Sequence, residues 1–391
     1  MSGSRMSGPD SDARGNAASR EGERRERRPG RSAGAGWFPA SSGGLVRNLL
    51  LLAALVAVML GVDAGVEALV ARDVLSPYSV LIARYVGINV VMAASLNLVN
   101  GVAGQFSIGH AGFMAVGAYT SAMITLTTRA QPGTALGTTI FVGSLVAGGI
   151  LAACAGWLVG LPSLRLRGDY LAIVTLGFGE IIRVVIVNVE SLGGSRGLPG
   201  IPGFASIFWV GLFAALTIVV LHRVARSDYG RTLLAIREDE VAASAMGVDT
   251  TSKKVGAFTI AAFFAGIAGG LFAHTLAYLN PNSFTFIKSF DYVVMVILGG
   301  MGSLSGSVLA AVLLTVLLEF LRPTTLARGF SGLGLERAGD WISTHDFRIS
   351  LYALLLIGMM LLRPNGLLGS REIWNLRAFR WLRRPARGDG S

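Results

Sequence analysis

The chain has 391 residues, of which 52% are hydrophobic and only 15% are charged. Soluble domains carry about 25% charged residues, so this composition excludes an ordinary soluble protein and indicates an integral membrane protein. The net charge of +11 does not indicate nucleic-acid binding, because the arginines flank apolar segments, as membrane orientation requires. The single cysteine, Cys154, excludes an intramolecular disulfide.

The first 44 residues are rich in Gly, Ser and Arg and include GERRERRPGR at Gly22–Arg31. Such a segment has little apolar surface to bury, so we expect residues 1–44 to form a disordered cytoplasmic tail. Contact with anionic lipid headgroups is the alternative. No small-residue cleavage site follows, which argues against a signal peptide. A membrane domain is expected over residues 45–369, and a basic cytoplasmic tail over residues 370–391.

Ten apolar stretches between the tails could cross a bilayer, some of them broken or re-entrant. They are Leu45–Val62, Tyr78–Val99, Phe106–Leu126, Thr138–Leu161, Asp169–Val189, Phe204–His222, Val255–Leu279, a broken pair within Phe290–Leu321, and Ile349–Leu362. The predicted fold class is therefore all-α, a polytopic membrane protein with about ten transmembrane segments. The 52 glycines indicate helices that approach one another closely.

The distribution of positive charge supports this count. With the N-terminal tail inside, alternate crossings place Arg165, Arg167, the polar segment 223–254 and the basic stretch Asn375–Arg387 in the cytoplasm. This holds only if Phe290–Leu321 crosses twice. A single crossing would put the most basic tail outside, against the positive-inside rule. We therefore expect both termini to be cytoplasmic.

Two glycine-rich stretches interrupt the apolar pattern. One is Asn100–Ala118, with the sequence NGVAGQFSIGHAGFMAVGA, and the other is Gly299–Gly306, with the sequence GGMGSLSG. Irregular backbone at membrane depth is tolerated where it is buried in protein or lines an aqueous cavity, and paired interruptions point to a translocation site. Close helix packing with a tight turn explains each stretch equally well. The candidate path residues in the first stretch are Gly104, Gln105, Ser107, Gly109 and His110.

Two ionisable residues lie inside the fifth predicted span. Glu180 and Arg183 are three positions apart, so they can form an ion pair on one face of a helix. A structural ion pair that faces the bundle interior is the simpler interpretation. Because intramembrane charges are costly, a role in gating or in lining the path is the alternative.

The segment 223–254 is longer than a connection between two spans requires. Asp239 or Glu238 can cap a short helix, and Gly247 can end it. Between them lies an apolar face at helical spacing, made of Val241, Ala242, Ala245 and Met246. We expect this helix to fit into a groove of a partner protein.

Several catalytic motifs are missing from the sequence. There is no GxxxxGK[ST] phosphate loop, no HExxH, no Cys/His cluster and no GxSxG elbow. There is also no series of intramembrane carboxylates of the kind that relays protons in many carriers. We therefore predict a non-enzymatic transport subunit with no catalytic residues, metal or cofactor of its own. The energy for transport would then be supplied by another protein.

Several motifs, in the same order, carry a family resemblance. They are Ser95–Thr120, GDYLAIVTLGFGEIIRVVIVN at Gly168–Asn188, Gly193–Gly203, YGRTLLAIREDEVAASAMGVD at Tyr229–Asp249, GGMGSLSG, and RPNGLLG at Arg363–Gly369. From about Tyr78 to Gly369, the chain resembles the LivM-type permeases of branched-chain amino acid ABC importers.

The resemblance implies a cytoplasmic loop of the form EAAxxxG that docks into an ATPase subunit. Ala242, Ala243 and Gly247 match this pattern, whereas Val241 stands where the glutamate would be and Glu240 lies one position earlier. The expected docking residues are Arg237, Glu238, Asp239, Glu240, Ala242, Ala243 and Gly247. The implied partners are a LivH-like second permease, two ATPase subunits that bind ATP, and an extracytoplasmic binding protein.

The resulting prediction is a path for leucine, isoleucine and valine across the bacterial inner membrane, driven by ATP through alternating access. A related ABC permease for urea, amides or a monosaccharide is one alternative. An ion-coupled secondary carrier is another, and it would transport without nucleotide.

Overall fold

The computed structural model of the chain describes residues 44–163, 169–321 and 366–369, together with a few positions between 350 and 361. The chain divides into two units, residues 1–54 and residues 55–391. Residues 44–54, the described part of the first unit, are helical. The expected tails therefore lie outside the described residues, except for residue 44, as do Arg165, Arg167 and most of the predicted span Ile349–Leu362.

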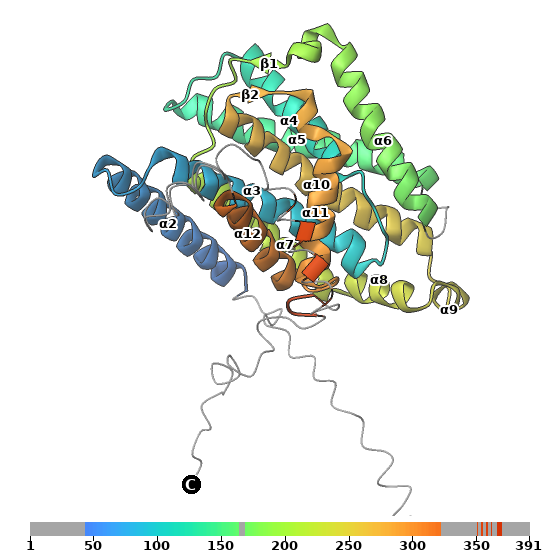
Figure 1. The fold of residues 1–391 in the computed structure, drawn as a ribbon. Helices are drawn as coiled ribbons and strands as arrows, with labels where there is room; N and C mark the ends of the chain where they lie inside the picture. The colour runs from blue at the N-terminus through green and yellow to red at the C-terminus, as the bar shows by residue number, and fades with distance from the viewer. Residues whose placement is uncertain are drawn as a thin grey trace, which may run out of the picture. The chain divides into compact units, whose positions relative to one another are not determined.

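The described residues are almost entirely helical, which confirms the predicted all-α class (Figure 1). The elements are α2 (Gly44–Ala71), α3 (Pro77–Asn97), the π-helical turn η1 (Leu98–Val102), α4 (His110–Thr127), α5 (Ala135–Ser163), α6 (Asp169–Asn188), the 3₁₀ turns η2 (Glu190–Leu192) and η3 (Gly194–Arg196), β1 (Leu198–Pro199), α7 (Ile207–Arg226), α8 (Asp228–Glu238), α9 (Glu240–Ala245), α10 (Thr250–Leu276), β2 (Tyr278–Leu279), the 3₁₀ turn η4 (Pro281–Phe284), α11 (Phe286–Gly299) and α12 (Leu304–Phe320). The two strands pair antiparallel.

Within the described residues, six helices are long and apolar enough to cross a membrane. They begin at Ala53, Pro77, Ala135, Tyr170, Ile207 and Thr250. The shorter helices α4, α11 and α12 occupy the third predicted span and the broken pair. The chain is therefore a polytopic membrane protein, as predicted.

Some predicted boundaries were wrong. The first span was expected to end at Val62, but α2 continues to Ala71. The carboxylate of Asp63, which interrupts the apolar run, accepts a hydrogen bond from the backbone N–H of Phe208 at 3.1 Å and is thus satisfied. The broken pair begins at Phe286 instead of Phe290. The helix therefore includes Lys288, a charged residue that the apolar pattern had left outside the span.

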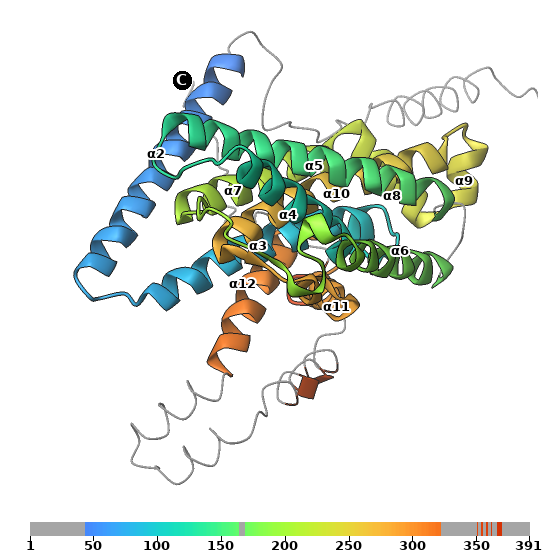
Figure 2. The ribbon, with the colours of Figure 1, turned by 90° about the horizontal axis from the view of Figure 1, so that it is seen from above.

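Helix α10 lies at the centre of the second unit and packs against α3, α4 and α5 (Figure 2). Glycines from three helices meet where α4, α5 and α10 cross. A Cβ atom at Gly148 would lie 2.8 Å from the carbonyl oxygen of Gly117, and one at Gly266 would lie 2.8 Å from that of Gly148. Side chains here would force the backbones apart, so the glycine content of the sequence is used for close helix approach.

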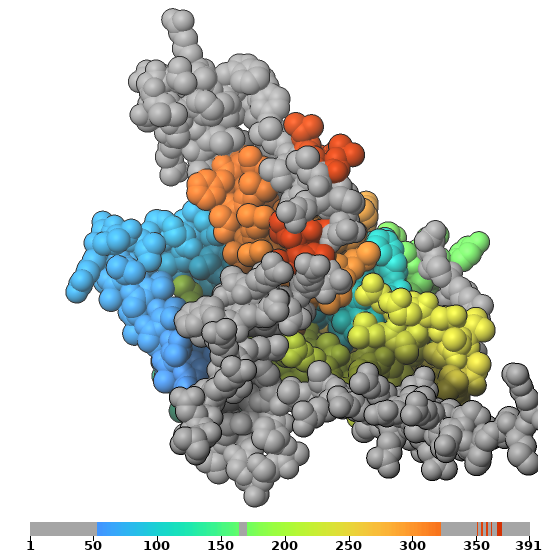
Figure 3. Space-filling model, turned by 90° about the horizontal axis from the view of Figure 1, so that it is seen from below, coloured from blue at the N-terminus to red at the C-terminus, as the bar shows by residue number. Residues whose placement is uncertain are grey.

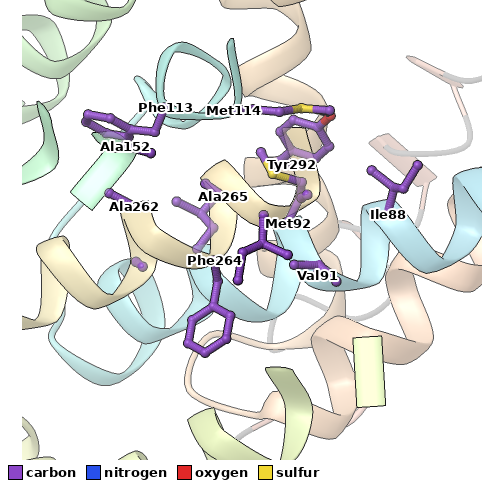
Figure 4. Close-up of a cluster of buried hydrophobic side chains, with 14 of the residues drawn as sticks. Ile88, Val91, Met92, Phe113, Met114, Ala152, Ala262, Phe264, Ala265 and Tyr292 are labelled. Carbon is purple, nitrogen blue, oxygen red and sulfur yellow. Dashed lines mark hydrogen bonds between the residues drawn. The ribbon is translucent and has the colours of Figure 1, made fainter. Parts of the chain in front are cut away.

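The apolar core continues from this crossing toward α11. Phe113 of α4 packs edge-on against Phe258 of α10, with ring centroids 5.4 Å apart. Tyr292 of α11 is fully buried and donates a hydrogen bond to the sulfur of Met114 at 3.3 Å (Figure 4). These contacts fix α4 between α10 and α11.

The ends of the helices gather at two faces of the second unit. At one, which we call the α8 face, the end of α3 meets the turn between α11 and α12, since Gly302 N–H donates to Asn97 Oδ1 at 3.0 Å. At the opposite one, the β face, the β1–β2 pair follows the ends of α6 and α10, and Tyr78 at the start of α3 bonds Glu319 at the end of α12. Helices α11 and α12 therefore form a hairpin whose tip lies at the α8 face.

Candidate functional site

Helices α8 and α9 lie on the surface beside α10, and Figure 3 shows them in yellow. Ser227 caps α8, and only Gly230, Leu233 and Ile236 of this helix are buried. The hydroxyl of Tyr229 donates to the backbone oxygen of Lys253 at 2.6 Å, and burial raises the pKa of Tyr229 to about 12. These contacts hold α8 against the start of α10.

The short helix α9 begins and ends as the sequence predicted. The carboxylate of Asp239 accepts hydrogen bonds from the N–H groups of Val241 and Ala242 at 2.9 and 3.0 Å. At the other end, Gly247 has a φ of +85° and donates to Ser244. This left-handed residue completes a glycine C-cap. Of the two predicted N-caps, Asp239 has that role, whereas Glu238 is the last residue of α8.

The apolar face predicted for this segment is exposed. The side chains of Val241 and Met246 are 68% and 85% exposed, whereas Ala243 is buried against the rest of the chain. Glu240 forms an ion pair with Lys254 of α10 at 2.7 Å. The carboxylate that stands nearest to the family's glutamate position is therefore bound within the chain, and the apolar face is left uncovered.

Arg237, the penultimate residue of α8, connects this surface pair to the bundle. Its Nη1 atom donates to the backbone oxygen of Gly101 in η1 at 2.6 Å. A Cβ atom at Gly302 would lie 2.9 Å from the same nitrogen, and one at Gly104 would lie 2.6 Å from Arg237 Cγ. One side chain therefore contacts both glycine-rich interruptions. The sequence did not predict this contact.

Between η1 and α4 the chain turns back into the bundle. Residues 104, 106 and 108 are accessible or partly so, whereas Gln105, Ser107 and Gly109 are buried, which gives an alternating pattern. The side-chain amide of Asn100 donates a hydrogen bond to the backbone oxygen of Ser107 at 3.3 Å and accepts one from the backbone N–H of Ser107 at 3.2 Å. His110 begins α4 and shares a hydrogen bond of 2.8 Å with Ser95 Oγ.

The predicted path residues are thus brought together, and their side chains lie inside the chain. Gln105 is 4% exposed, and Ser107 and His110 are buried. Within the described part of the chain, the amide atoms of Gln105 and the hydroxyl of Ser107 have no hydrogen-bond partner. Buried polar atoms without a hydrogen-bond partner are costly, so their presence here calls for an explanation, of which a functional role is one. The most accessible side chain of the segment is that of Phe106, which is 37% exposed and which the sequence analysis did not single out.

Helix α6 packs against this segment. Thr175 Oγ1 accepts a hydrogen bond from the N–H of Ile108 at 3.2 Å. Gly109 lies against the backbone of Thr175, and a Cβ atom at Gly112 would lie 2.9 Å from the Cα atom of Gly179. Close glycine packing therefore accounts for much of this interruption, as the alternative interpretation held.

The ion pair predicted on α6 is present. Arg183 Nε and Glu180 Oε2 are 2.7 Å apart, and both side chains are between a quarter and a third exposed. The other oxygen of Glu180 accepts a hydrogen bond from the backbone N–H of Phe286, the first residue of α11, at 3.0 Å. Glu180 therefore caps α11, a structural role that the spacing alone did not predict.

Comparison with known proteins supplies the family. A family model described as the permease component of branched-chain amino acid transport systems matches residues 78–362. The chain is 35% identical over 366 residues to the high-affinity branched-chain amino acid transport system permease protein LivM of Salmonella typhimurium, covering 85% of this chain and 77% of that protein. It is 34% identical, with the same coverage, to LivM of Escherichia coli. It is 22% identical over 302 residues to LivH of Salmonella typhimurium, covering 72% of this chain and 91% of that protein. No solved structure matches.

Proposed function

The chain belongs to the family of branched-chain amino acid transport permeases, and from this premise we propose that it is the LivM-type subunit of an ABC importer. It would form part of the membrane path for leucine, isoleucine and valine. The observation that carries this proposal is the apolar face of α9. This short helix lies at the surface, beside the membrane-spanning bundle, and its apolar side chains are exposed.

The ATPase subunit is the proposed occupant of that face. Val241 and Met246 present apolar side chains to solvent on a helix that is fixed at both ends. An amphipathic helix of this kind fits a hydrophobic groove through a few anchor side chains. The predicted docking set around it includes Ala242 and Gly247, and of its acidic members Glu240 is already paired with Lys254.

Arg237 is the proposed mechanical link between docking and transport. A displacement of α9 moves α8, to which it is joined directly at Asp239. Arg237 then transmits this displacement to η1 and to the tip of the α11–α12 hairpin, at both of which the backbone departs from a regular α-helix. Such irregular points bend more easily than helices, which makes them natural hinges.

The proposed translocation path runs beside the segment that contains Gly104, Gln105, Ser107, Gly109 and His110. Its unsatisfied polar atoms support this proposal, because a rearranged segment could present them to a polar solute. Glu180 and Arg183 would move with it, since α6 packs directly on this segment. ATP binding would close the ATPase pair and turn the path outward, and hydrolysis would reset it.

The similarity to both LivM and LivH proteins supports a pair of homologous permeases. Two ATPase subunits and an extracytoplasmic binding protein complete the proposed complex, in the bacterial inner membrane with both termini cytoplasmic. The α8 face is then cytoplasmic and the β face extracytoplasmic. The basic residues of the 223–254 segment agree with this orientation.

Co-purification tests the proposal directly. The tagged protein is extracted from its own membranes in mild detergent, and its partners are identified by mass spectrometry. We expect stoichiometric recovery of an ATPase and a second permease, and ATP-dependent leucine uptake by the reconstituted complex. Recovery of the protein alone, still able to transport without ATP, would contradict the proposal. Uptake of urea, amides or a monosaccharide in place of leucine would contradict the proposed assignment of branched-chain amino acids as substrates.

A further inference from the structure

A cavity of about 590 Å³ lies between α3, α11 and α12, close to the β face. Its volume lies within the range of about 300 to 1,000 Å³ that is typical of small-molecule sites. The cavity is lined by residues between 78 and 89 of α3, between 287 and 295 of α11 and between 315 and 319 of α12, by Phe272 of α10, and by residues of η4 and the turn after it. It is therefore at the end of the bundle opposite Arg237 and the docking helix.

The wall of this cavity carries both signs of charge. Lys288 and Asp291 of α11 form an ion pair of 3.3 Å, with side chains 36% and 27% exposed. Glu319 of α12 also lines the cavity, where it bonds the hydroxyl of Tyr78. Partly exposed ion pairs contribute little to stability, so a ligand with two charges can separate Lys288 and Asp291 at little cost.

The remaining wall is largely apolar. Leu81, Ile82, Ile287, Met295 and Leu318 line it, together with aromatic rings from α3, α10 and α11. At the far end, Asn89 donates a hydrogen bond to Thr315 at 2.8 Å. A solute that fits this cavity carries a positive and a negative group close together and a compact apolar side chain.

We propose that this cavity is the entry site for the zwitterionic amino acid, with Lys288 facing its carboxylate, Asp291 and Glu319 facing its ammonium group, and the apolar wall holding its branched side chain. This inference rests on the proposed function, from which the substrate class comes. The position of the charged groups in the first half of α11 and at the end of α12 suits a solute that arrives at the β face.

The cavity is connected to the rest of the proposed path through α11. Tyr292 lines the cavity and bonds Met114 of α4 at 3.3 Å. Ser289, next to Lys288, accepts a hydrogen bond from the N–H of Ala111 at 3.0 Å. Occupation of the cavity therefore affects α4, the helix that follows the segment with Gln105 and Ser107.

Thiol labelling in the assembled importer tests the site. In a Cys154→Ser background, the variant Ile287→Cys places a thiol in the cavity wall, and Leu136→Cys places one in an exposed position at the start of α5, outside the cavity. The probe is leucine and the readout is the rate of modification by a charged methanethiosulfonate. At ten times its Kd, leucine should slow labelling of Ile287→Cys by about tenfold, as single-site occupancy requires. Labelling of Leu136→Cys should not change.

Two analogues test the charge assignment. Leucinamide lacks the carboxylate and isocaproate lacks the ammonium group, so neither should protect the thiol of Ile287→Cys. The double exchange Lys288→Asp with Asp291→Lys keeps an ion pair but moves each charge to the other position. We expect it to raise the KM for leucine by about tenfold or more, the effect of losing one charged hydrogen bond. A purely structural pair would tolerate the exchange. Arg129→Met, an exposed cation outside the cavity, serves as the control and should leave KM unchanged.

The outcomes separate the two proposals. A complex that transports leucine with ATP, but whose Ile287→Cys thiol leucine does not protect, overturns the entry site and leaves the proposed function intact. Equal protection by leucine, leucinamide and isocaproate also overturns it. A complex that neither transports branched-chain amino acids nor shows protection overturns both.

Discussion

Arg237 Nη1 donates a hydrogen bond to the backbone oxygen of Gly101 over 2.6 Å, across 136 positions of sequence. The bond joins a surface helix to the π-helical end of α3. The same guanidinium lies against Gly302 at the tip of the α11–α12 hairpin. Three elements that the sequence separates widely therefore meet at one side chain.

Removing this side chain should uncouple transport from ATP hydrolysis. We expect Arg237→Ala to lower ATP-dependent uptake by about tenfold or more, because a hydrogen bond from a charged donor is worth about 1.5 to 3 kcal/mol. Although Arg237 belongs to the predicted docking set, its guanidinium is bonded to Gly101 within the chain, so the variant should keep the ATPase subunit and its basal ATP hydrolysis. The ratio of solute transported to ATP hydrolysed in proteoliposomes measures this effect.

A matched control lies on the same helix. Arg231 pairs with Asp228, and both side chains are largely exposed. Arg231→Ala should leave the transport ratio unchanged. Equal loss in Arg231→Ala and Arg237→Ala would mean that general charge near the membrane matters, and not the bond to Gly101.

The exposed face of α9 should control assembly. Met246 is 85% exposed, and burial of such a side chain at an interface contributes about 1.5 to 3 kcal/mol. Met246→Asp should reduce co-purification of the ATPase subunit strongly while the permease pair remains intact. Ser244→Asp adds the same charge to the same helix outside the apolar face and should retain the ATPase. Retention by both variants would place the ATPase elsewhere.

Overpacking the glycine crossing should destabilise the bundle. A Cβ atom at Gly148 would lie 2.8 Å from the oxygen of Gly117, whereas nothing lies within 4 Å of one at Gly143 on the same helix. Gly148→Ala should cost about 1 to 3 kcal/mol of stability, and Gly143→Ala should cost nothing measurable. Thermal unfolding in detergent, followed by size-exclusion chromatography, compares the two. Equal stability would show that the crossing can relax.

Glu180 should matter more as a cap than as a charge. Its carboxylate accepts the N–H of Phe286 at 3.0 Å in addition to pairing with Arg183. Glu180→Ala leaves that N–H unpaired and should lower stability by about 1 kcal/mol, a typical loss for a helix cap. Glu180→Gln keeps an acceptor and should recover most of this loss. Glu190→Gln, in the loop after α6, is the control. If Glu180→Gln transports normally, the pair has no essential role in gating.

Local features of the site were predicted from the sequence with good accuracy. Asp239 as a helix cap, Gly247 as a helix end, and the apolar positions Val241 and Met246 between them all depend on residues within one or two helical turns. The Glu180–Arg183 pair is local in the same sense. Capping, left-handed backbone and i,i+3 pairing are short-range interactions, so a single stretch of sequence specifies them.

Features that join distant segments were not predicted. The broken pair was expected to begin at Phe290, which left Lys288 outside the span and hid the charged wall that it forms with Asp291 and Glu319. The spacing of Lys288 and Asp291 was the available signal. Glu319, which is 31 and 28 positions further along the chain, joins them only because α11 and α12 fold into a hairpin.

The sequence by itself determined that the chain is an apolar, all-α membrane bundle, because hydropathy over about 20 residues decides whether a helix can replace its contacts with water by contacts with lipid. It also determined which short helix presents an exposed apolar face. Only the tertiary structure decided that Arg237 reaches Gly101, that Gly117, Gly148 and Gly266 share one crossing, and that a cavity with both signs of charge lies between α3, α11 and α12. In a bilayer the apolar faces of helices do not discriminate between lipid and protein, so hydrophobicity leaves the choice of neighbours open. Close backbone contact and a few polar bonds make that choice, and both depend on residues that are far apart in the chain.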